Sequence, residues 1–148
     1  MEHVTHRFDF PVADVIVGDR GRKDIGSLDE LMASIKSYGL FHPITVNAED
    51  NNTLIIGERR LRAHKQLGRE TIRAYVVSGV TEADIRAMEL DENIVRRQLH
   101  WSEEANMTAL VIKAQGCTQQ EYARFSGISQ PTISRHVNTA AALAIVPN

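Results

Sequence analysis

Three arginines occupy positions 59, 60 and 62, directly after a short apolar run and a glycine. The apolar run predicts a strand that ends at Gly57, and the residues after it predict a helix. The first turn of such a helix exposes backbone N–H groups and the positive end of the helix dipole. Arginine adds forked donors that match phosphate oxygens. We therefore expect a phosphate cradle formed by Gly57, Arg59, Arg60 and Arg62.

The local charge agrees with an anion site, although a solvated helix face is the alternative. From Ile55 to Arg73, six Lys or Arg side chains stand against two Glu, which gives +4 in a chain whose formal net charge is −2. The GK[ST] ending of a P-loop is missing. The cradle is therefore expected to be of a different type.

A second group with suitable chemistry is formed by Glu92, Asn93 and Arg96. A carboxylate beside an amide oxygen suits Mg²⁺, which takes few protein ligands and shares its other positions with phosphate and water. Glu92 and Asn93 are thus suited to bind this metal, with Arg96 within reach of the same phosphates. The alternative is a surface ion pair between Glu92 and Arg96 at i, i+4 spacing, worth under about 1 kcal/mol. Spacing by itself favours that ion pair.

The elements that must position these residues form a mixed α+β module over about 1–80. Ser27 and Glu30 predict a capping box for a helix that ends at Gly39, and another helix closes at Gly68. Apolar alternation and β-branched runs predict strands, with a hairpin between the second and the third. The predicted strands lie at 8–18, 42–46, 53–57 and 71–77.

The rest of the chain is predicted to be helical. Thr81 caps a connecting helix over 81–100, which carries the Glu92 group, and a helical module follows over 101–148. In that module, Thr118 with Glu121 predicts the start of a short helix, and Gly127 predicts its end. Ser129 predicts the cap of the next helix. Two helices joined by a tight turn are typical of a helix-turn-helix, although an ordinary helical corner is the alternative.

A helix-turn-helix presents side chains to DNA from the start of its second helix. From 117 to 148 the charge is only +1, from two Arg against one Glu, so this module alone is expected to bind DNA weakly. Dimerisation or further contacts would be needed. The expected DNA-binding residues are Thr118, Gln119, Ser129, Gln130, Thr132, Ser134 and Arg135.

Three ordered segments resemble the motifs of the ParB family of plasmid and chromosome partition proteins. They are RGRKDIGSLDELMASIKSYGLFHPITV, LIIGERRLRAHKQLG and LDENIVRRQL, and the resemblance covers about 8–145. It implies a ParB/sulfiredoxin-like α+β domain followed by an all-α helix-turn-helix domain. In the family, the GERR element holds the triphosphate of CTP, Glu and Asn of ENxxR hold Mg²⁺, and the first motif, here with Arg22, lines the nucleobase pocket. The resemblance thus adds Glu58 to the residues expected around the phosphates. The resemblance also implies double-stranded DNA as partner and a homodimer, and it suggests a partition ATPase as a further partner.

Two positions differ from the family pattern. Arg20-Gly21-Arg22 stands where Gln-Pro-Arg is usual, and His42 replaces the glutamine before Pro43. Both changes fall in the expected base and triphosphate pocket. Family members also carry further DNA-contacting helices and a C-terminal dimerisation domain, so we expect this chain to be a fragment or a minimal relative.

The sequence therefore predicts a DNA-binding protein with a CTP- and Mg²⁺-dependent switch, acting in plasmid or chromosome partition or in related DNA-bound regulation. One alternative is a transcriptional repressor whose ParB-like domain has lost its nucleotide, and another is a small kinase or phosphatase on the same fold. The sequence identifies no catalytic residue, and resemblance implies at most slow CTP hydrolysis. Sulfiredoxin chemistry needs a cysteine in the phosphate-binding turn, and the only cysteine is Cys117.

Composition sets the remaining limits. Of the residues, 43% are hydrophobic but only 5% are aromatic, so the core is expected to be aliphatic. A single cysteine excludes an internal disulfide, and the six histidines lack metal-ligand spacing. The sequence shows neither a signal peptide nor a run long enough to span a membrane. The expected location is the cytoplasm, in association with the nucleoid or a plasmid.

Overall fold

The computed structural model describes residues 3–18, 25–39 and 42–145. The chain divides into two compact units, Met1–Gln98 and Leu99–Asn148. The first unit combines a sheet with helices, which confirms the mixed α+β prediction for this part of the chain. Its strands are β1 (His3–Pro11), β2 (Ile44–Asn47), β3 (Thr53–Ile56) and β4 (Thr71–Ser78). Its α-helices are α1 (Asp29–Tyr38), α2 (Glu58–Gln66), α3 (Glu82–Leu90) and α4 (Asn93–Arg97).

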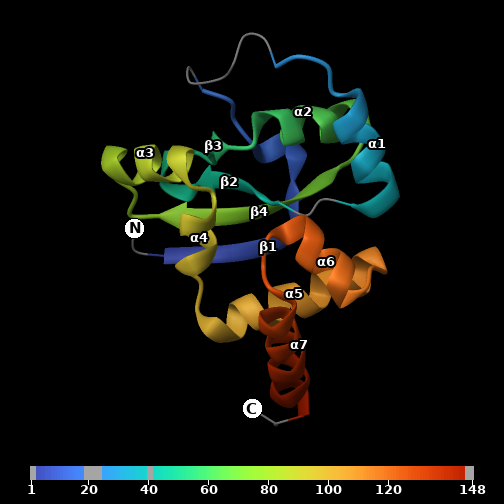
Figure 1. The fold of residues 1–148 in the computed structure, drawn as a ribbon. Helices are drawn as coiled ribbons and strands as arrows, with labels where there is room; N and C mark the ends of the chain where they lie inside the picture. The colour runs from blue at the N-terminus through green and yellow to red at the C-terminus, as the bar shows by residue number, and fades with distance from the viewer. Residues whose placement is uncertain (1–2, 19–24, 40–41, 146–148) are drawn as a thin grey trace. The chain divides into compact units, whose positions relative to one another are not determined.

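The four strands form one mixed sheet in the order β1-β4-β2-β3 (Figure 1). β1 pairs antiparallel with β4, β4 pairs parallel with β2, and β2 pairs antiparallel with β3. The β2–β3 pair confirms the predicted hairpin, which turns through a short 3₁₀ helix, Ala48–Asp50. After it, Asn51 and Asn52 adopt positive φ values of 52° and 61°, a conformation that asparagine tolerates. The hairpin places the end of β3 at the start of α2.

The first strand differs from the prediction. β1 begins at His3 and ends at Pro11, and a 3₁₀ turn, Val12–Asp14, follows where the sequence predicted a strand as far as Gly18. Proline has no N–H to donate to a strand ladder, so it suits a strand end. Between this turn and Gly18, the last described residue of the segment, the strand pairing is limited to an isolated bridge from Ile16 to Thr53.

The capping box at the start of α1 was also predicted wrongly. The helix begins at Asp29, and the Ser27 hydroxyl accepts the N–H of this first residue (3.3 Å) instead of the Glu30 N–H that a capping box requires. Leu28 is at the N-cap position because its side chain is buried in the core. The end of the helix is as predicted, since Gly39 has φ 82° and its N–H bonds to the carbonyl of Ile35.

The predicted helix over 81–100 is two helices. Thr81 caps α3, as predicted, and forms a capping box with Asp84. The helix ends at Leu90, and Asp91 after it has φ −145°. The Asp91 carboxylate then accepts the N–H of Asn93 (3.0 Å) and a guanidinium N–H of Arg97 (2.8 Å). These bonds stabilise a new helix start, so the chain turns between α3 and α4.

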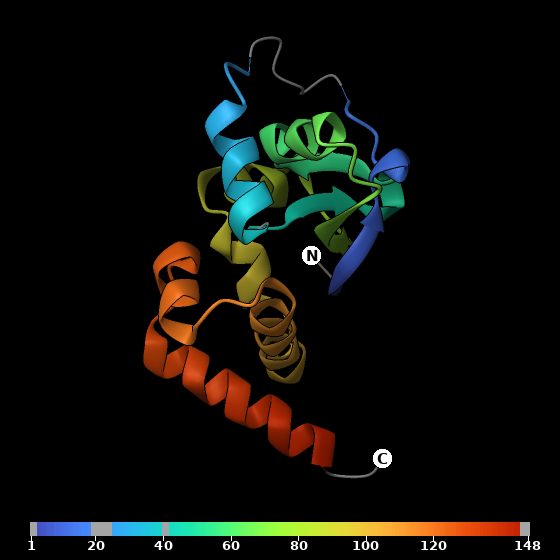
Figure 2. The ribbon, with the colours of Figure 1, turned by 90° about the vertical axis from the view of Figure 1, so that its right-hand side faces the viewer.

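The core of the first unit is mostly aliphatic, and its buried aromatic side chains among the described residues are Phe10 and Tyr75. α1 and α2 lie side by side, as two views show (Figures 1 and 2), and α2 packs against β2 and β4. The low aromatic content of the sequence thus corresponds to the observed core. The buried cluster consists of Phe10, Val12, Val15, Ile35, Ile44, Val46, Leu54, Leu61, Ala63, Ile72 and Ala74.

The second unit contains α5 (Trp101–Gln115), α6 (Gln119–Ser126) and α7 (Gln130–Ile145). α7 packs against both α5 and α6. The buried side chains of this unit include Tyr122, Ile128 and Ile133. The lone cysteine of the sequence, Cys117, precedes α6, and burial raises the pKa of its thiol, which disfavours the reactive thiolate. None of the described helices in either unit has the length and apolarity needed to cross a membrane.

Candidate functional site

Gly57 joins β3 to α2 in a conformation that excludes other residues. It has φ 106° and ψ 32°, in the left-handed region that favours glycine. A Cβ atom at this position would lie 2.7 Å from Cγ2 of Ile44 and 3.2 Å from its Cα. Because Ile44 is fully buried, it has no room to retreat. The helix therefore starts in close contact with β2, and the N–H groups of its first turn have no partner within the helix.

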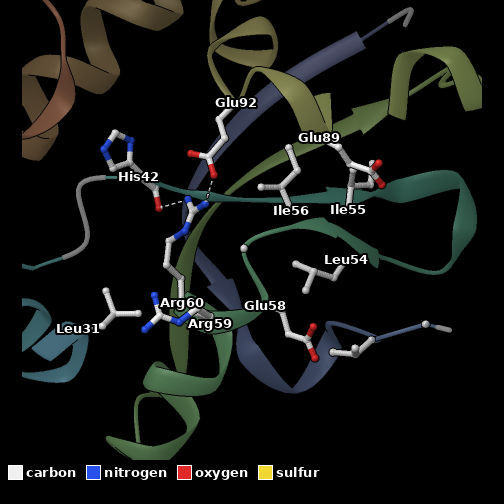
Figure 3. Close-up of a pocket in the computed structure, with 13 residues that line it drawn as sticks. Leu31, His42, Leu54, Ile55, Ile56, Glu58, Arg59, Arg60, Glu89 and Glu92 are labelled. Carbon is white, nitrogen blue, oxygen red and sulfur yellow. Dashed lines mark hydrogen bonds and ion pairs between the residues drawn. The ribbon is translucent and has the colours of Figure 1, made fainter. Parts of the chain in front are cut away.

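A pocket of about 690 Å³ opens at this helix start (Figure 3). This volume is in the range of small-molecule sites. The wall combines aliphatic side chains from β3 and α1 with charged side chains from α2 and the α3–α4 region. The lining residues are Val17, Gly18, Leu31, His42, Leu54, Ile55, Ile56, Gly57, Glu58, Arg59, Arg60, Glu89 and Glu92.

Arg59 is exposed and extends toward Leu31 of α1 (Figure 3). Its Nε donates to the carbonyl of Ile25 (3.1 Å), and one terminal nitrogen donates to the carbonyl of Ser27 (2.9 Å). Both acceptors are neutral. A phosphate oxygen would form a stronger, charge-assisted bond with the same guanidinium. Arg59 is thus placed at the pocket and able to exchange its partners.

Arg60 is held much more firmly. One terminal nitrogen donates to the carbonyls of His42 (2.9 Å) and Pro43 (2.8 Å), and the other donates to Oε1 of Glu92 (2.6 Å). Burial lowers the pKa of the Arg60 guanidinium, and the charge and hydrogen bond of Glu92 oppose that shift. Its backbone carbonyl also lies 2.9 Å from Nδ1 of the buried His64.

Glu58 and Arg62 form an ion pair along α2. The guanidinium of Arg62 donates to the Glu58 carboxylate at 2.7 Å, with i, i+4 spacing. Glu58 lines the pocket, whereas Arg62 does not. Arg73, which was counted with this basic cluster, is buried in β4, where its Nε donates to Nε2 of His6 (3.3 Å). The basic cluster of the sequence is therefore dispersed, and two of its arginines reach the pocket.

The predicted metal group is only partly at the pocket. Glu92 lines it, and its carboxylate pairs with Arg60, 32 residues earlier, in place of the i, i+4 partner Arg96. Asn93 and Arg96 lie outside the lining residues. Arg22 lies outside the described residues. Of the predicted nucleotide-site residues, the structure thus gathers Gly57, Glu58, Arg59, Arg60 and Glu92.

Sequence analysis missed part of the pocket. Glu89 is one such residue, although its i, i+3 spacing to Glu92 on a predicted helix was an available signal. The apolar wall from Val17, Leu31 and Leu54 had no local signal, because these residues come from separate segments. The described lining holds three glutamates against two arginines, so it carries about one net negative charge.

The predicted DNA-binding residues lie at the starts of two helices: Thr118 and Gln119 at the start of α6, and the other five at the start of α7. The hydroxyls of Thr118 and Ser129 cap the two helices by accepting N–H bonds at 3.1 Å and 3.4 Å, and Gly127 has φ 77°, as predicted. At the start of α7, Thr132 lies between two partners: its Oγ1 is 2.8 Å from the Ser129 hydroxyl and accepts from Arg135 at 3.1 Å. All seven candidates are at least partly accessible: Thr118, Gln119, Ser129, Gln130, Thr132, Ser134 and Arg135.

Comparison with known proteins identifies the family. The model of the ParB N-terminal domain matches residues 11–94, which is more than half of the chain. The chain belongs to the ParB family. Within it, the probable chromosome-partitioning protein ParB of Campylobacter jejuni is 38% identical over 112 residues, which cover 75% of this chain and 40% of that protein. A nucleoid occlusion protein of Bacillus cytotoxicus is 33% identical over 131 residues, which cover 85% of this chain and 45% of that protein.

A solved ParB structure shares the fold. The C-terminally truncated chromosome-partitioning protein ParB of Caulobacter crescentus, crystallised with CTP-gamma-S, aligns with a TM-score of 0.50 and 24% identity. The alignment covers 99% of this chain and 81% of that one. The chain spans less than half the length of the two ParB family relatives described above. The family thus includes partition and nucleoid occlusion proteins.

Proposed function

We propose that this ParB family chain is a nucleotide-gated DNA-binding protein of plasmid or chromosome partition, or of related DNA-bound regulation. Its ligand would be CTP with Mg²⁺, bound at the pocket between the start of α2 and the α3–α4 turn. One observation supports this most directly: the start of α2, with Arg59 beside it, opens into a pocket that also contains the Glu92 carboxylate.

The phosphates are proposed to bind at the start of α2. The N–H groups of the first helical turn have no carbonyl acceptor within the helix, so they are available to a ligand. The helix dipole also favours negative charge at this end. Arg59 would exchange its two carbonyl partners for phosphate oxygens. Gly57 allows close approach because it has no side chain. The ion pair of Glu58 with Arg62 would keep the Glu58 carboxylate from repelling the ligand.

The chemistry of the donor set fits a metal that is shared with the ligand. Within the described part of the chain, no group of three or more His, Cys, Asp or Glu side chains can hold a metal ion. Glu92 is half exposed at the pocket, and Asn93 follows it. Mg²⁺ often takes one or two protein ligands and completes its shell with phosphates and water. It would also offset the negative charge of a lining rich in glutamate. Because the Caulobacter crescentus protein was crystallised with CTP-gamma-S, CTP is the first nucleotide to test.

DNA is proposed to bind at the start of α7, where the helix N-terminus and Arg135 face solvent. With few basic residues in this unit, affinity would depend on a second copy of the chain or on further contacts. A nucleotide that favours one arrangement of the chain would change the affinity for DNA, and DNA would change the affinity for nucleotide by the same factor.

Calorimetric titration with CTP, ATP and GTP, each with Mg²⁺ and with or without duplex DNA, tests the proposal. Arg59→Ala should weaken CTP binding about 10- to 150-fold, which corresponds to one charged hydrogen bond of about 1.5–3 kcal/mol. Lys65→Ala is the matched control, because it removes one exposed positive charge from the same helix outside the pocket. Equal affinities of the Arg59 variant and the wild type would contradict the phosphate assignment. Duplex binding without any nucleotide binding would instead support the simple repressor.

A further inference from the structure

The Arg60 side chain joins three segments that are distant in the sequence. From the start of α2, it reaches the carbonyls of His42 and Pro43 before β2, and it reaches Glu92 at the α3–α4 turn. These partners are 17 to 32 residues away in the chain. The Arg60 side chain is only 15% exposed, whereas that of Glu92 is 50% exposed. The buried arginine therefore restrains a carboxylate that solvent would otherwise leave mobile.

The donors of Arg60 are largely committed to these contacts. A guanidinium has five N–H groups in a fixed fork. One terminal nitrogen already donates to the carbonyls of His42 and Pro43. The other donates to Oε1 of Glu92, and Figure 3 shows this bond together with the bond to His42. A phosphate that captured this guanidinium would have to replace its bonds to three acceptors, of which the Pro43 carbonyl is partly buried and the Glu92 carboxylate is charged. The neighbouring Arg59 is exposed, so it can move to a ligand more easily.

We propose that Arg60 is a positioning residue that holds Glu92 at the pocket and supports ligand binding through that carboxylate instead of through contact with phosphate. The pair uses Oε1 of Glu92 and leaves Oε2 for a cation. Partners that orient a ligating carboxylate contribute to metal affinity although they do not touch the metal. This inference rests on the proposed function. It assigns different roles to two adjacent arginines: Arg59 binds the phosphates, and Arg60 orients the Glu92 carboxylate.

The test compares CTP binding in Mg²⁺ and in EDTA for the wild type, Arg60→Gln, Glu92→Gln and the double variant. In Mg²⁺, each single variant should lose about 10- to 100-fold in affinity, and the double variant should bind no more weakly than Glu92→Gln. In EDTA, Arg60→Gln should bind as the wild type does. Arg7→Gln is the control, because it removes an exposed arginine that pairs with Asp9 (4.0 Å) on β1, outside the pocket. It should bind CTP normally in both buffers.

Two results together would overturn the proposal and assign Arg60 to phosphate. Arg60→Gln would bind CTP more weakly than the wild type in EDTA, and the fold-loss of the double variant in Mg²⁺ would equal the product of the two single fold-losses. A second readout needs no ligand. If the pair exists, the Tm loss of the double variant should fall short of the summed single losses by about 4 °C or more, and additive losses would contradict it. If Arg60→Gln does not fold, Arg60→Lys replaces it, because Lys keeps the charge but cannot hold both carbonyls and Glu92 in one fork.

A wild type that binds no CTP in either buffer would overturn the proposed function and, with it, the role of Arg60 in ligand binding. Non-additive Tm losses in that case would still show that Arg60 positions Glu92. The two failures are thus distinguishable.

Discussion

Replacement of Gly57 by alanine tests whether the site depends on the contact between the start of α2 and β2. The new Cβ would lie 2.7 Å from Cγ2 and 3.1 Å from Cβ of the buried Ile44. It would also force alanine into φ 106°. Left-handed strain costs about 1–2 kcal/mol, and an overpacked core costs about 1–3 kcal/mol. Together they should remove about 2–5 kcal/mol of a native stability that is typically about 5–15 kcal/mol.

The assay is thermal unfolding of Gly57→Ala beside Gly68→Ala. Gly68 follows α2 and has φ 72°, but a Cβ there would meet no atom within 4 Å. The control therefore carries the backbone strain without the collision. For a domain of this size, each kcal/mol lowers Tm by about 4–8 °C. We expect a Tm loss of roughly 10–30 °C for Gly57→Ala and roughly 5–15 °C for Gly68→Ala. Equal losses would show that the close approach to Ile44 contributes nothing.

Two further predictions concern titration and DNA. Burial, and to a smaller extent the positive charge of Arg73, lowers the pKa of His6 to about 3. Between pH 6.5 and pH 3, His6 is therefore protonated in the unfolded chain but largely neutral in the folded chain. Stability should therefore fall, on the order of 2–4 kcal/mol, as pH decreases through that range; urea unfolding of His6→Gln should show a flatter pH dependence, and an unchanged one would refute the assignment. Arg135→Gln should weaken duplex binding and reduce by about 1 the slope of log affinity against log salt concentration, while the affinity for CTP stays constant. Fluorescence anisotropy over a salt series measures this slope. An unchanged slope would show that Arg135 makes no phosphate contact.

Local signals in the sequence predicted the helix ends where a side chain or a glycine acts on its own backbone. Thr81 and Thr118 cap helices, and Gly39 and Gly127 end them, as their positions indicated. The same kind of signal failed at Ser27, because burial of Leu28 moved the start of α1 to Asp29. A capping motif is a local preference, and core packing has the larger energy.

The break after α3 shows a second limit of pattern analysis. The sequence predicted one connecting helix over 81–100, which includes Asp91. In the structure, Asp91 instead accepts the N–H of Asn93 and pairs with Arg97. The turn brings Glu92 to Arg60, whereas a continuous helix would have favoured Arg96. The aspartate side chain readily accepts hydrogen bonds from nearby backbone N–H groups. An aspartate within a predicted helix can therefore instead mark the point where one helix ends and another begins.

The sequence by itself determined the hairpin, the glycine at the strand-to-helix junction and membership in the ParB family, because these depend on residues close together in the chain or on motifs in a fixed order. Only the tertiary structure decided which arginine is buried and which is exposed. Arg59 and Arg60 are adjacent and chemically identical, but the fold directs one toward Ser27 and the other toward Pro43 and Glu92. Such partners are chosen by the packing of distant segments, which no local pattern in the sequence encodes.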